Sequence, residues 1–469
     1  MADNDDKRPL ISRADDIRSI MRTVQAGKSC ILVGVDGIGK TTLMRELLSA
    51  TVREQYHAPE HERFIFLPLD ANELSRPSAL AYYRQMALLL EPILNRYHLP
   101  FSSDENILAV NNEEMVRKLL FDRVEAIVTR CEQCRLVFLL DRFEVAFTET
   151  EPQFFRVLQS LRSRSNGQVC YVAASTNIPA LICDEQQQRV VREMFPELFN
   201  GNIYGIKPLQ RQDSQLVIDQ GLQSRQAALA AQLLEITGAH PGLLKAVMMV
   251  WNGEENALTA WDSQEQIIPR LLQETTIVSQ CEQIWYSLSE VEQYCLKQIR
   301  RGLFTQHDSS PPYSIRLIQS ALHMLVLKGI IREEPRSNTS YQPFSPLFAS
   351  YVAQQFSAGL PGLQLDLLQQ QVWIDGTLRA SHLTNKEFRL LRFLAENAGR
   401  VCSREETTRA VYGDTYNPKR DDARLDALVE RTRKSIGDDT CPSRFLETVR
   451  GAGHRLHEYL GERLFQSPI

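Results

Sequence analysis

Short apolar runs alternate with amphipathic stretches through the first half of this chain. The apolar runs have the length and composition of β-strands, and they occupy residues 29–35, 64–70, 135–140, 168–175 and 202–206. Apolar residues recur at helical spacing in the stretches around them, at residues 10–26, 42–53, 79–94 and 113–131. Strands that alternate with helices predict an α/β domain with a parallel sheet that is covered on both faces.

The pattern changes beyond residue 206. Residues 211–253 show only helical spacing, with a break at residues 238–242. From about residue 275 the chain reads as two helices and a short β-ribbon, and a Gly/Pro-rich loop at residues 356–363 marks a boundary. Beyond this loop the chain reads as a strand-rich start, three helical segments and a terminal hairpin at residues 445–456. We therefore expect a multidomain protein with units at residues 1–206, 207–274, 275–358 and 363–462.

Composition narrows the classes of protein without changing this division. The 469 residues are enough for several domains, and 43% hydrophobic with 24% charged residues is ordinary for a globular protein. The formal net charge of -5 provides no overall attraction to nucleic acid, so any such contact requires a local basic patch. No apolar run approaches the ~18 residues of a membrane span, and the polar N-terminus has no signal-peptide core.

The nine cysteines are scattered, and Cys131 and Cys134 form the only close pair. No second cysteine pair or histidine cluster accompanies them, so their spacing does not predict a zinc site. Cysteines inside apolar runs, such as Cys30 and Cys170, behave as small hydrophobic residues. This usage predicts a protein of the reducing cytoplasm.

A phosphate-binding loop follows the first strand. Residues 34–41 have the form G-x-x-x-x-G-K-T and lie between a strand and a helix. Lys40 can reach the β- and γ-phosphates, the Thr41 hydroxyl can ligate Mg²⁺, and the helix from Thr42 directs its positive dipole end at the same anion. A chance glycine-rich turn is the alternative, but the order of strand, loop and helix favours ATP or ADP with Mg²⁺. The glycines that let backbone N–H groups turn toward phosphate are Gly34, Gly37 and Gly39.

A carboxylate follows the third apolar run. Asp141 comes directly after residues 135–140, where the tip of a buried strand faces the ligand crevice of a parallel sheet. We expect Asp141 to hold Mg²⁺ through water, beside Thr41. Glu144 lies just past the tip, where it can orient the attacking water, so Asp141 and Glu144 are the candidate catalytic residues. A solvated loop acid is an equal alternative for Glu144.

These motifs resemble the STAND family of signal-transduction NTPases, which are related to AAA+ ATPases. Besides the P-loop, residues 11–16 resemble the family's adenine-side lead-in, and residues 238–244 are similar to the lid motif whose proline packs against the base. The resemblance covers about residues 10–358, and it implies an NTPase core, a helical lid and a winged-helix domain. It also implies that Arg13 and Pro241 contact the nucleotide.

The same resemblance points to two nucleotide sensors. Asn177, after the fourth strand, stands where many members carry a sensor arginine, and His240 lies in the lid motif. A helix-turn residue with a satisfied ring is the alternative for His240. Arg142 follows Asp141 where a second acid is frequent. The departures at Arg142 and Asn177 predict a slow ATPase.

The C-terminal unit has its own whole-domain pattern. Thr384 and Glu387 are spaced as a capping box at the start of its first helix. Residues 423–436 read as an amphipathic helix, and residues 448–456 as a hairpin with Arg and Gly at its turn. This arrangement resembles the OmpR-type winged helix-turn-helix of bacterial response regulators. The apolar face of the amphipathic helix, which we expect to pack on the core, consists of Leu425, Val429, Thr432 and Ile436.

The resemblance implies specific DNA contacts. Arg431 matches the base-reading position, Arg433 a phosphate position, Arg450 the wing arginine of the minor groove, and Thr448 a flanking contact. Contact residues that are usual in the family are replaced by Leu428, Glu430 and His454. These replacements weaken phosphate affinity and predict DNA binding as an oligomer. A solvated charged face is the alternative reading, because acids interrupt the basic stripe: Asp421, Asp422, Asp426 and Glu430.

We therefore expect an ATP-operated switch that regulates transcription. ATP binding would close the lid and the winged helix on the core, promote assembly into a homo-oligomer, and place several DNA-binding domains on repeated half-sites. RNA polymerase is a further candidate partner, and no membrane contact is expected. Two alternatives stay open at this point, an ATPase sensor of a defence system and an origin-recognition-like initiator, which also joins AAA+ to winged helices.

Overall fold

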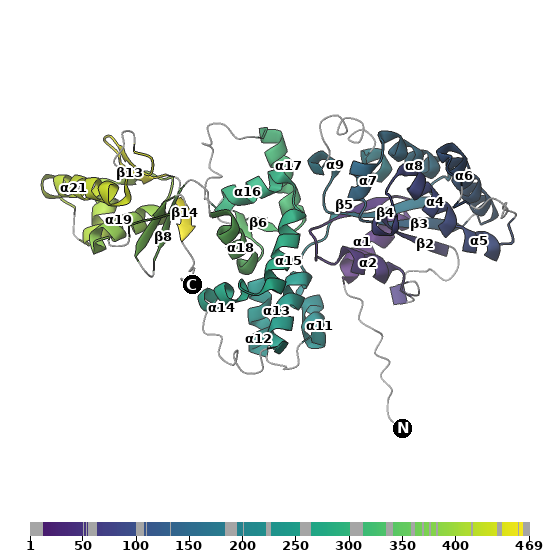
Figure 1. Cartoon of the computed structure of the whole chain (residues 1–469), viewed down its shortest axis with the longest axis horizontal. Coiled ribbons are helices and arrows are strands. Elements are labelled where there is room, and N and C mark those ends of the chain that lie inside the picture. The colour runs from purple at the N-terminus through teal and green to yellow at the C-terminus, as the bar shows by residue number, and fades with distance from the viewer. Residues whose placement is uncertain are drawn as a thin grey trace, which may run out of the picture.

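The computed structural model places the elements in three groups along its long axis (Figure 1). An α/β core holds the N-terminal elements, helices occupy the middle, and a small domain holds the C-terminal elements. The structure describes residues 13–462 except 50, 53, 55–62, 100–106, 109, 132, 183–194, 200, 222–226, 254–263, 301–312, 334–340, 358–361, 368–369, 375–376, 381–382, 414–415, 439–442 and 458. Residues 11 and 12 of the predicted lead-in lie outside these ranges. Within them, no helix combines the length and the apolar character that crossing a membrane requires.

A parallel sheet forms the N-terminal core, as the alternating pattern predicts. Its strand order is β2-β3-β4-β1-β5, and every neighbouring pair is parallel. The carboxyl ends of all strands therefore meet at one edge, where ligands bind in open α/β sheets. The strands are β1 (Cys30–Val33), β2 (Arg63–Asp70), β3 (Cys134–Asp141), β4 (Val169–Ser175) and β5 (Ile203–Gly205).

Helices cover both faces of this sheet. Side chains along each strand point alternately to the two faces, and each face packs into its own hydrophobic cluster. In β3, Val137 and Leu139 belong to the cluster that holds α1 (Ala14–Gln25) and α2 (Lys40–Leu47). The intervening residues of β3, such as Phe138, belong to the cluster on the opposite face. The helices of that second cluster are α4 (Ala79–Leu89), α5 (Glu91–Arg96), α6 (Glu113–Arg130), α7 (Glu144–Glu149) and α8 (Pro152–Arg164). A strand buried on both faces produces the continuous apolar runs seen in the sequence.

In its described residues, the middle of the molecule is helical apart from one β-ribbon. The predicted break at residues 238–242 lies between α12 (Ala227–Thr237) and α13 (Pro241–Gly253). The ribbon pairs β6 (Ile331–Glu333) with β7 (Tyr341–Pro343) in antiparallel fashion. The other helices of this region are α11 (Arg211–Gly221), α14 (Gln264–Leu271), α15 (Thr275–Tyr286), α16 (Glu290–Arg300), α17 (Ile315–Leu327) and α18 (Pro346–Ser357).

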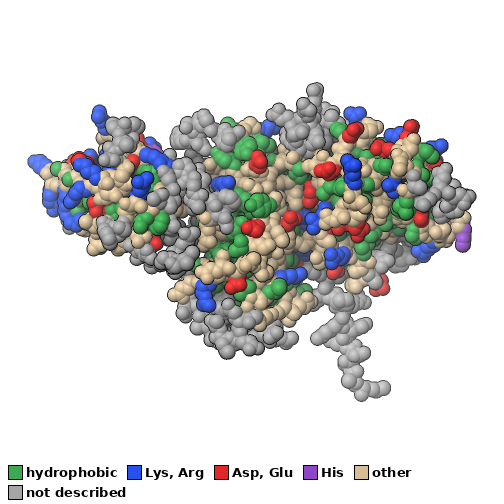
Figure 2. All heavy atoms as spheres, viewed as in Figure 1, with side chains coloured by type: hydrophobic (Ala, Val, Ile, Leu, Met, Phe, Trp, Pro, Cys, Tyr) green, Lys and Arg blue, Asp and Glu red, His purple; other side chains and the backbone are tan. Residues whose placement is uncertain are grey.

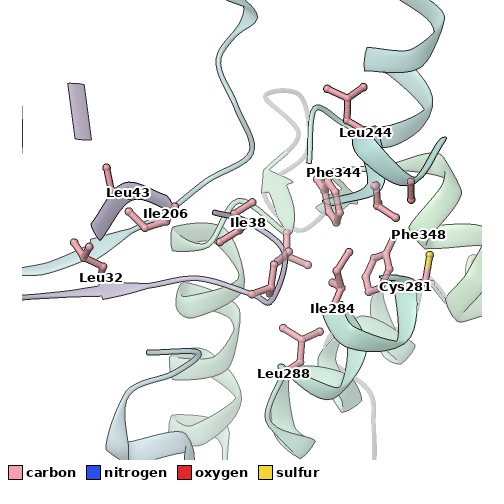
Figure 3. Close-up of a cluster of buried hydrophobic side chains, with 14 of the residues drawn as sticks. Leu32, Ile38, Leu43, Ile206, Leu244, Cys281, Ile284, Leu288, Phe344 and Phe348 are labelled. Carbon is pink, nitrogen blue, oxygen red and sulfur yellow. The ribbon is translucent and has the colours of Figure 1, made fainter. Parts of the chain in front are cut away.

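One hydrophobic cluster joins the core to the middle helices. It includes Leu32 of β1, Leu244 of α13, Ile284 of α15 and Phe348 of α18. Figure 3 shows Ile38, from the loop after β1, between the side chains of the core and those of the middle helices. The middle helices cannot leave the core without exposing this apolar surface to water, which costs free energy in proportion to its area.

The C-terminal domain has a separate hydrophobic cluster of its own. The predicted capping box is confirmed, because the Thr384 side chain accepts from the Glu387 backbone while the Glu387 carboxylate accepts from the Thr384 backbone. Three helices form its centre, α19 (Asn385–Glu396), α20 (Arg404–Tyr412) and α21 (Pro418–Ile436). Its strands are β8 (Leu363–Asp366), β9 (Gln371–Ile374), β10 (Thr377–Ala380), β11 (Cys402–Ser403), β12 (Leu446–Val449), β13 (Gly453–Leu456) and β14 (Tyr459–Glu462).

Three local expectations differ from the structure. Helix α2 ends at Leu47 instead of about residue 53, because Ser49 N–H bonds back to the Glu46 carbonyl and closes the last turn. Among the described residues, three helices lie between residue 275 and the β-ribbon where two were predicted, and Ser314 caps the third of them, α17. A disulfide joins Cys131 to Cys134, whereas the sequence predicts reduced cysteines.

Candidate nucleotide and DNA sites

The loop between β1 and α2 has the backbone conformation of a phosphate cradle. Gly37 and Gly39 have φ of 75° and 100°, in the left-handed region that favours glycine. A Cβ at Gly37 would lie 2.6 Å from Nε2 of Gln280, so this position also admits a close approach of α15. Position 37 therefore needs glycine both to adopt the left-handed turn and to leave room for Gln280.

Lys40 lies at the start of α2, and its ammonium is turned into the loop. Only 8% of Lys40 is exposed, and its Nζ donates to the carbonyl oxygens of Gly34 at 2.7 Å and of Val35 at 3.1 Å. Asp36 contributes a carboxylate oxygen at 3.5 Å. A cation enclosed by acceptors next to a helix N-terminus is placed to neutralise a phosphate group.

Asp141 and Glu144 lie at the tip of β3, on either side of a sharp turn. Asp141 is 8% exposed, and its Oδ1 accepts from the backbone N–H of Arg142, whose φ of 53° turns the chain. Burial raises the pKa of the Glu144 carboxyl, and the nearby Lys40 ammonium opposes this rise. Oε2 of Glu144 is buried without a hydrogen-bond partner among the described residues. This environment differs from that of a solvated loop acid.

These side chains line one cavity of about 630 Å³, a volume typical of small-molecule sites. Gly34 holds Lys40 through its carbonyl and is outside the lining. Asn177 and His240 are also outside it. The predicted site residues that the structure brings together around the cavity are Arg13, Gly37, Gly39, Lys40, Thr41, Thr42, Asp141, Glu144 and Pro241.

Arg13 closes one side of this cavity. Its guanidinium donates to the Ile38 carbonyl at 2.6 Å and to Asp16 at 3.0 Å, so the side chain lies along the P-loop turn. Its backbone N–H donates to the Asp213 carboxylate of α11 at 3.1 Å. The residue thus joins the loop to the first of the middle helices.

His240 lies behind the P-loop and is fully buried. Its Nδ1 accepts from the backbone N–H of Leu243 at 3.3 Å, an interaction that caps the start of α13. Its Nε2 is buried without a partner in the described part of the chain. Burial lowers the pKa of His240 to about 3, so the ring is neutral at physiological pH.

Sequence reasoning missed the residues that α15 contributes to this site. Gln283 lines the cavity beside the P-loop residues. The Ser287 hydroxyl accepts from the backbone N–H of Asp36 at 3.1 Å, and Gly242 N–H donates to the Gly37 carbonyl at 3.1 Å. Gly242 belongs to the lid motif, but no motif marks Gln283 or Ser287, because single polar residues on an amphipathic helix look the same whether they face solvent or a ligand.

In the C-terminal domain, α21 buries the predicted face. Leu425, Val429, Thr432 and Ile436 are all at most 2% exposed. Leu428 is only 1% exposed, which corrects the expectation that it occupies a DNA-contact position. It extends the apolar face by one residue, because positions 425, 428, 432 and 436 share a stripe of a 3.6-residue helix.

His454 also differs from its expected place at the DNA surface. It lies in β13, paired with Cys402 of β11 and Thr448 of β12, and it is fully buried. Its ring nitrogens have no hydrogen-bond partner among the described residues. Burial lowers the pKa of His454 to about 4, and the nearby Arg404 acts in the same direction.

The predicted DNA-contact residues lie on α21 and the adjoining hairpin. Arg431 is exposed, and its Nε donates to the Ala427 carbonyl at 3.2 Å. Arg433 donates to the Leu446 carbonyl at 2.8 Å and to the Thr448 hydroxyl at 2.9 Å, so it ties α21 to β12. Arg450 is exposed at the hairpin tip between β12 and β13. Figure 2 shows Lys and Arg side chains gathered at this end of the molecule.

Acids on α21 neutralise several neighbouring cations. Arg404 bonds to Asp426 at 2.8 Å, and Lys434 bonds to Glu430 at 2.9 Å. Arg420 bonds at 2.8 Å to Asp421, which is fully buried. Each pair reduces the positive charge that these cations can offer to phosphates.

Comparison with known proteins gives family matches for two parts of the chain. A family model described as AAA ATPase domain matches residues 9–172, and one described as transcriptional regulatory protein, C terminal, matches residues 379–456. A Walker-type ATPase of Pyrococcus abyssi is similar at 13% identity over 74% of this chain and 99% of its own, with a TM-score of 0.45. The DNA-binding domain of Klebsiella pneumoniae RstA, in complex with the RstA box, is similar at 28% identity over 21% of this chain and 92% of its own, with a TM-score of 0.19.

A third solved structure, the Orc1 protein of Aeropyrum pernix in complex with DNA, is similar at 12% identity over 74% of this chain and 94% of its own, with a TM-score of 0.35. The family matches confirm the predicted AAA+-related core and the predicted regulator-type C-terminal domain. The chain is therefore an AAA ATPase domain fused to an OmpR-type, C-terminal DNA-binding domain of transcriptional regulatory proteins.

Proposed function

We propose that this protein is an ATP-operated, STAND-type switch that regulates transcription. The observation that carries the proposal is the cavity at the strand tips, which collects the P-loop, Asp141, Glu144 and Pro241 of the lid helices. The same chain ends in a DNA-binding domain with its own hydrophobic core. A nucleotide site and a DNA-binding domain in one chain favour control of DNA binding by nucleotide.

The residues of the cavity fit ATP and Mg²⁺. Lys40 and the N-terminus of α2 offer positive charge to the phosphates, while the Thr41 hydroxyl and the Asp141 carboxylate are oxygen donors of the kind that Mg²⁺ prefers. Mg²⁺, when bound, neutralises charge on the transferred phosphoryl group. The carboxylate oxygen of Glu144 that has no hydrogen-bond partner among the described residues supports a role in orienting water. We expect slow turnover, because Arg142 and Asn177 differ from the residues that STAND ATPases usually carry there.

Coupling to the middle helices follows from their contacts with the P-loop. Gly242 and Ser287 bond directly to its backbone, and Gln280 packs on Gly37. A change of loop conformation therefore changes the contacts of the lid and of α15. A ligand shifts such an equilibrium only as far as it binds the two arrangements with different affinity.

The DNA-binding domain is suited to act in several linked copies. Its paired acids leave few cations for phosphate, so one copy binds weakly, while tethered copies raise the effective concentration at adjacent half-sites. Nucleotide-dependent self-association then controls DNA affinity. Arg431, Arg433, Thr448 and Arg450 provide the contacts, and RNA polymerase is a candidate downstream partner.

The test is a titration of labelled operator DNA, selected from a random library, with full-length protein and with residues 360–469, each with and without ATP and Mg²⁺. We expect ATP to increase the affinity of the full-length protein only. Lys40→Ala should remove the increase although Lys40 is remote from the DNA-binding domain, and Lys28→Ala, an exposed lysine near β1, is the matched control. Equal affinity in all four conditions would separate the two activities and favour a defence-type sensor.

A further inference from the structure

The side chain at the sensor position contacts a different domain. Asn177 follows β4 and is 1% exposed, and its Nδ2 donates a short hydrogen bond to Oε2 of Glu292 on α16. A carboxylate only accepts, so the amide must turn its NH₂ group toward Glu292. The NH₂ group of Asn177 is thus already hydrogen-bonded to Glu292, which lies 115 positions further along the chain.

Glu292 is itself held in place by a buried network. The carboxylate accepts from Nζ of Lys328 at 2.7 Å, and from the backbone N–H and hydroxyl of Ser289 at 2.9 Å and 3.0 Å. Both members of the Glu292–Lys328 ion pair are 0% exposed. A buried pair is expensive to break, because either partner alone leaves an uncompensated charge. Lys328 therefore fixes the position of Glu292 against Asn177.

This network lies beside the nucleotide cavity. Asn177 and Glu144 line a second cavity of about 640 Å³, and Glu144 lines the nucleotide cavity as well. The end of β4 also bonds to both phosphate-site loops, since Ser175 accepts from Gly34 N–H and Ala174 accepts from Phe143 N–H. Asn177 therefore lies two residues beyond a strand end that bonds to both phosphate-site loops, and it lines the cavity that shares Glu144 with the nucleotide cavity.

We propose that Glu292, positioned by Lys328, competes with the terminal phosphate of ATP for the amide of Asn177 and thereby sets the preference of the protein between ADP and ATP. The inference rests on the proposed nucleotide site. ADP lacks that phosphate and leaves the Asn177–Glu292 contact intact. ATP brings a second anion to the same donor, and it repels the carboxylate, so full engagement requires α16 to move away. The contact thus favours ADP and connects the third phosphate to the middle helices.

The test variant is Glu292→Gln with Lys328→Met in the full-length protein. The paired change removes both charges together and avoids the orphan charge that a single substitution would leave. The glutamine oxygen can still accept from Asn177 and Ser289, but it is a weaker acceptor than a carboxylate. Arg392→Met with Glu396→Gln is the control, because it removes the same charges from an exposed pair in the DNA-binding domain.

The measurement is the dissociation constant for ATP and for ADP, with Mg²⁺, by calorimetry, together with a thermal unfolding scan. We expect ATP to bind about tenfold more tightly relative to ADP in the variant, the size of one charge-assisted hydrogen bond, with ADP affinity unchanged. An unchanged ratio, or equal weakening of both nucleotides, would overturn the inference by making the network purely structural. Absence of nucleotide binding by the unsubstituted protein would instead overturn the nucleotide site itself.

Discussion

At the scale of single residues, Glu144 is a carboxylate in a place that disfavours its charge. Burial raises the pKa of this carboxyl, so the contribution of Glu144 to the free energy of unfolding is fully present below the ordinary pKa of 4.5 and declines as the pH rises. Glu144→Gln removes the ionisation, and we expect a higher melting temperature at pH 7. If Glu144 orients the attacking water, ATP hydrolysis should fall by about 10²–10⁴-fold while ATP binding persists.

Melting scans and single-turnover ATP hydrolysis, compared between the unsubstituted protein and the Glu144→Gln variant, test these two expectations. In the unsubstituted protein the rate should fall on the acid side at a pH above the ordinary glutamate range, because only the carboxylate form can accept a proton. Glu149→Gln, on the same helix, is the control. Equal hydrolysis by the Glu144→Gln protein would leave Glu144 without a catalytic role.

His454 gives a second pH-dependent prediction. Its pKa is lowered from 6.5 to about 4 by burial, so the folded domain loses stability as the pH falls below about 6.5. The loss from this group is about 2 kcal/mol at pH 5. His454→Met removes the titration, so the gap in unfolding free energy between pH 7 and pH 5 should shrink by that amount. Urea unfolding followed at both pH values tests it, and an unchanged gap would contradict it.

Residue environments were the least predictable part of the structure. The P-loop and Asp141 follow from sequence, because their function depends on local spacing along the chain. Leu428 and His454 stand where the family usually carries contact residues, yet both are buried. The resemblance supplies a position, but the burial of that position depends on which neighbours pack over it. The Asn177–Glu292 contact joins distant segments, so no local pattern could reveal it.

At the scale of elements, the turn between α12 and α13 is packed as tightly as the P-loop. Gly238 has φ of 59°, and a Cβ there would lie 2.2 Å from the Phe344 carbonyl oxygen. Gly201, with φ of 69°, has nothing within 4 Å of such a Cβ. Gly201→Ala should therefore cost only the left-handed strain of about 1–2 kcal/mol. Gly238→Ala should cost clearly more, and equal urea midpoints for both would contradict the packing.

Helix α21 carries two arginines that we expect to affect DNA binding in different ways. Arg431 has an exposed side chain, so Arg431→Ala should weaken binding by about 1–3 kcal/mol and relax preference at one base pair. Arg433 also ties the helix to β12, so Arg433→Ala should lower stability, weaken all sequences alike and reduce the salt slope by about one. Competition binding at several salt concentrations measures both, and Arg392→Ala on the exposed face of α19 is the control.

The sequence predicts the types of most elements, whereas it predicts the ends of helices and the short helices less well. The five strands of the core agree in place because buried parallel strands form continuous apolar runs. Helix α2 stops early because hydrogen bonds at Ser49 end it, a local event that apolar spacing does not register.

At the scale of the whole molecule, nucleotide should control association. The cavity is lined by the core, the lid and α15 together, so we expect bound ATP to contact all three at once. His240 caps α13 against the P-loop, and His240→Ala should reduce ATP-dependent self-association while the C-terminal domain stays folded. Sedimentation velocity with and without ATP measures this. Assembly equal to that of the unsubstituted protein would limit His240 to capping.

The separate hydrophobic cluster of the C-terminal domain has a consequence for how such chains can be recombined. The buried residues of that cluster all lie between Leu363 and Leu456, whereas the core shares a cluster with the middle helices. A crossover near residue 360 cuts through neither cluster. A chimaera could thus exchange one output module for another and keep its nucleotide response, whereas a crossover between β5 and α11 would divide a common interior. Within the described residues, this boundary would separate the proposed nucleotide-responsive unit from the DNA-binding domain.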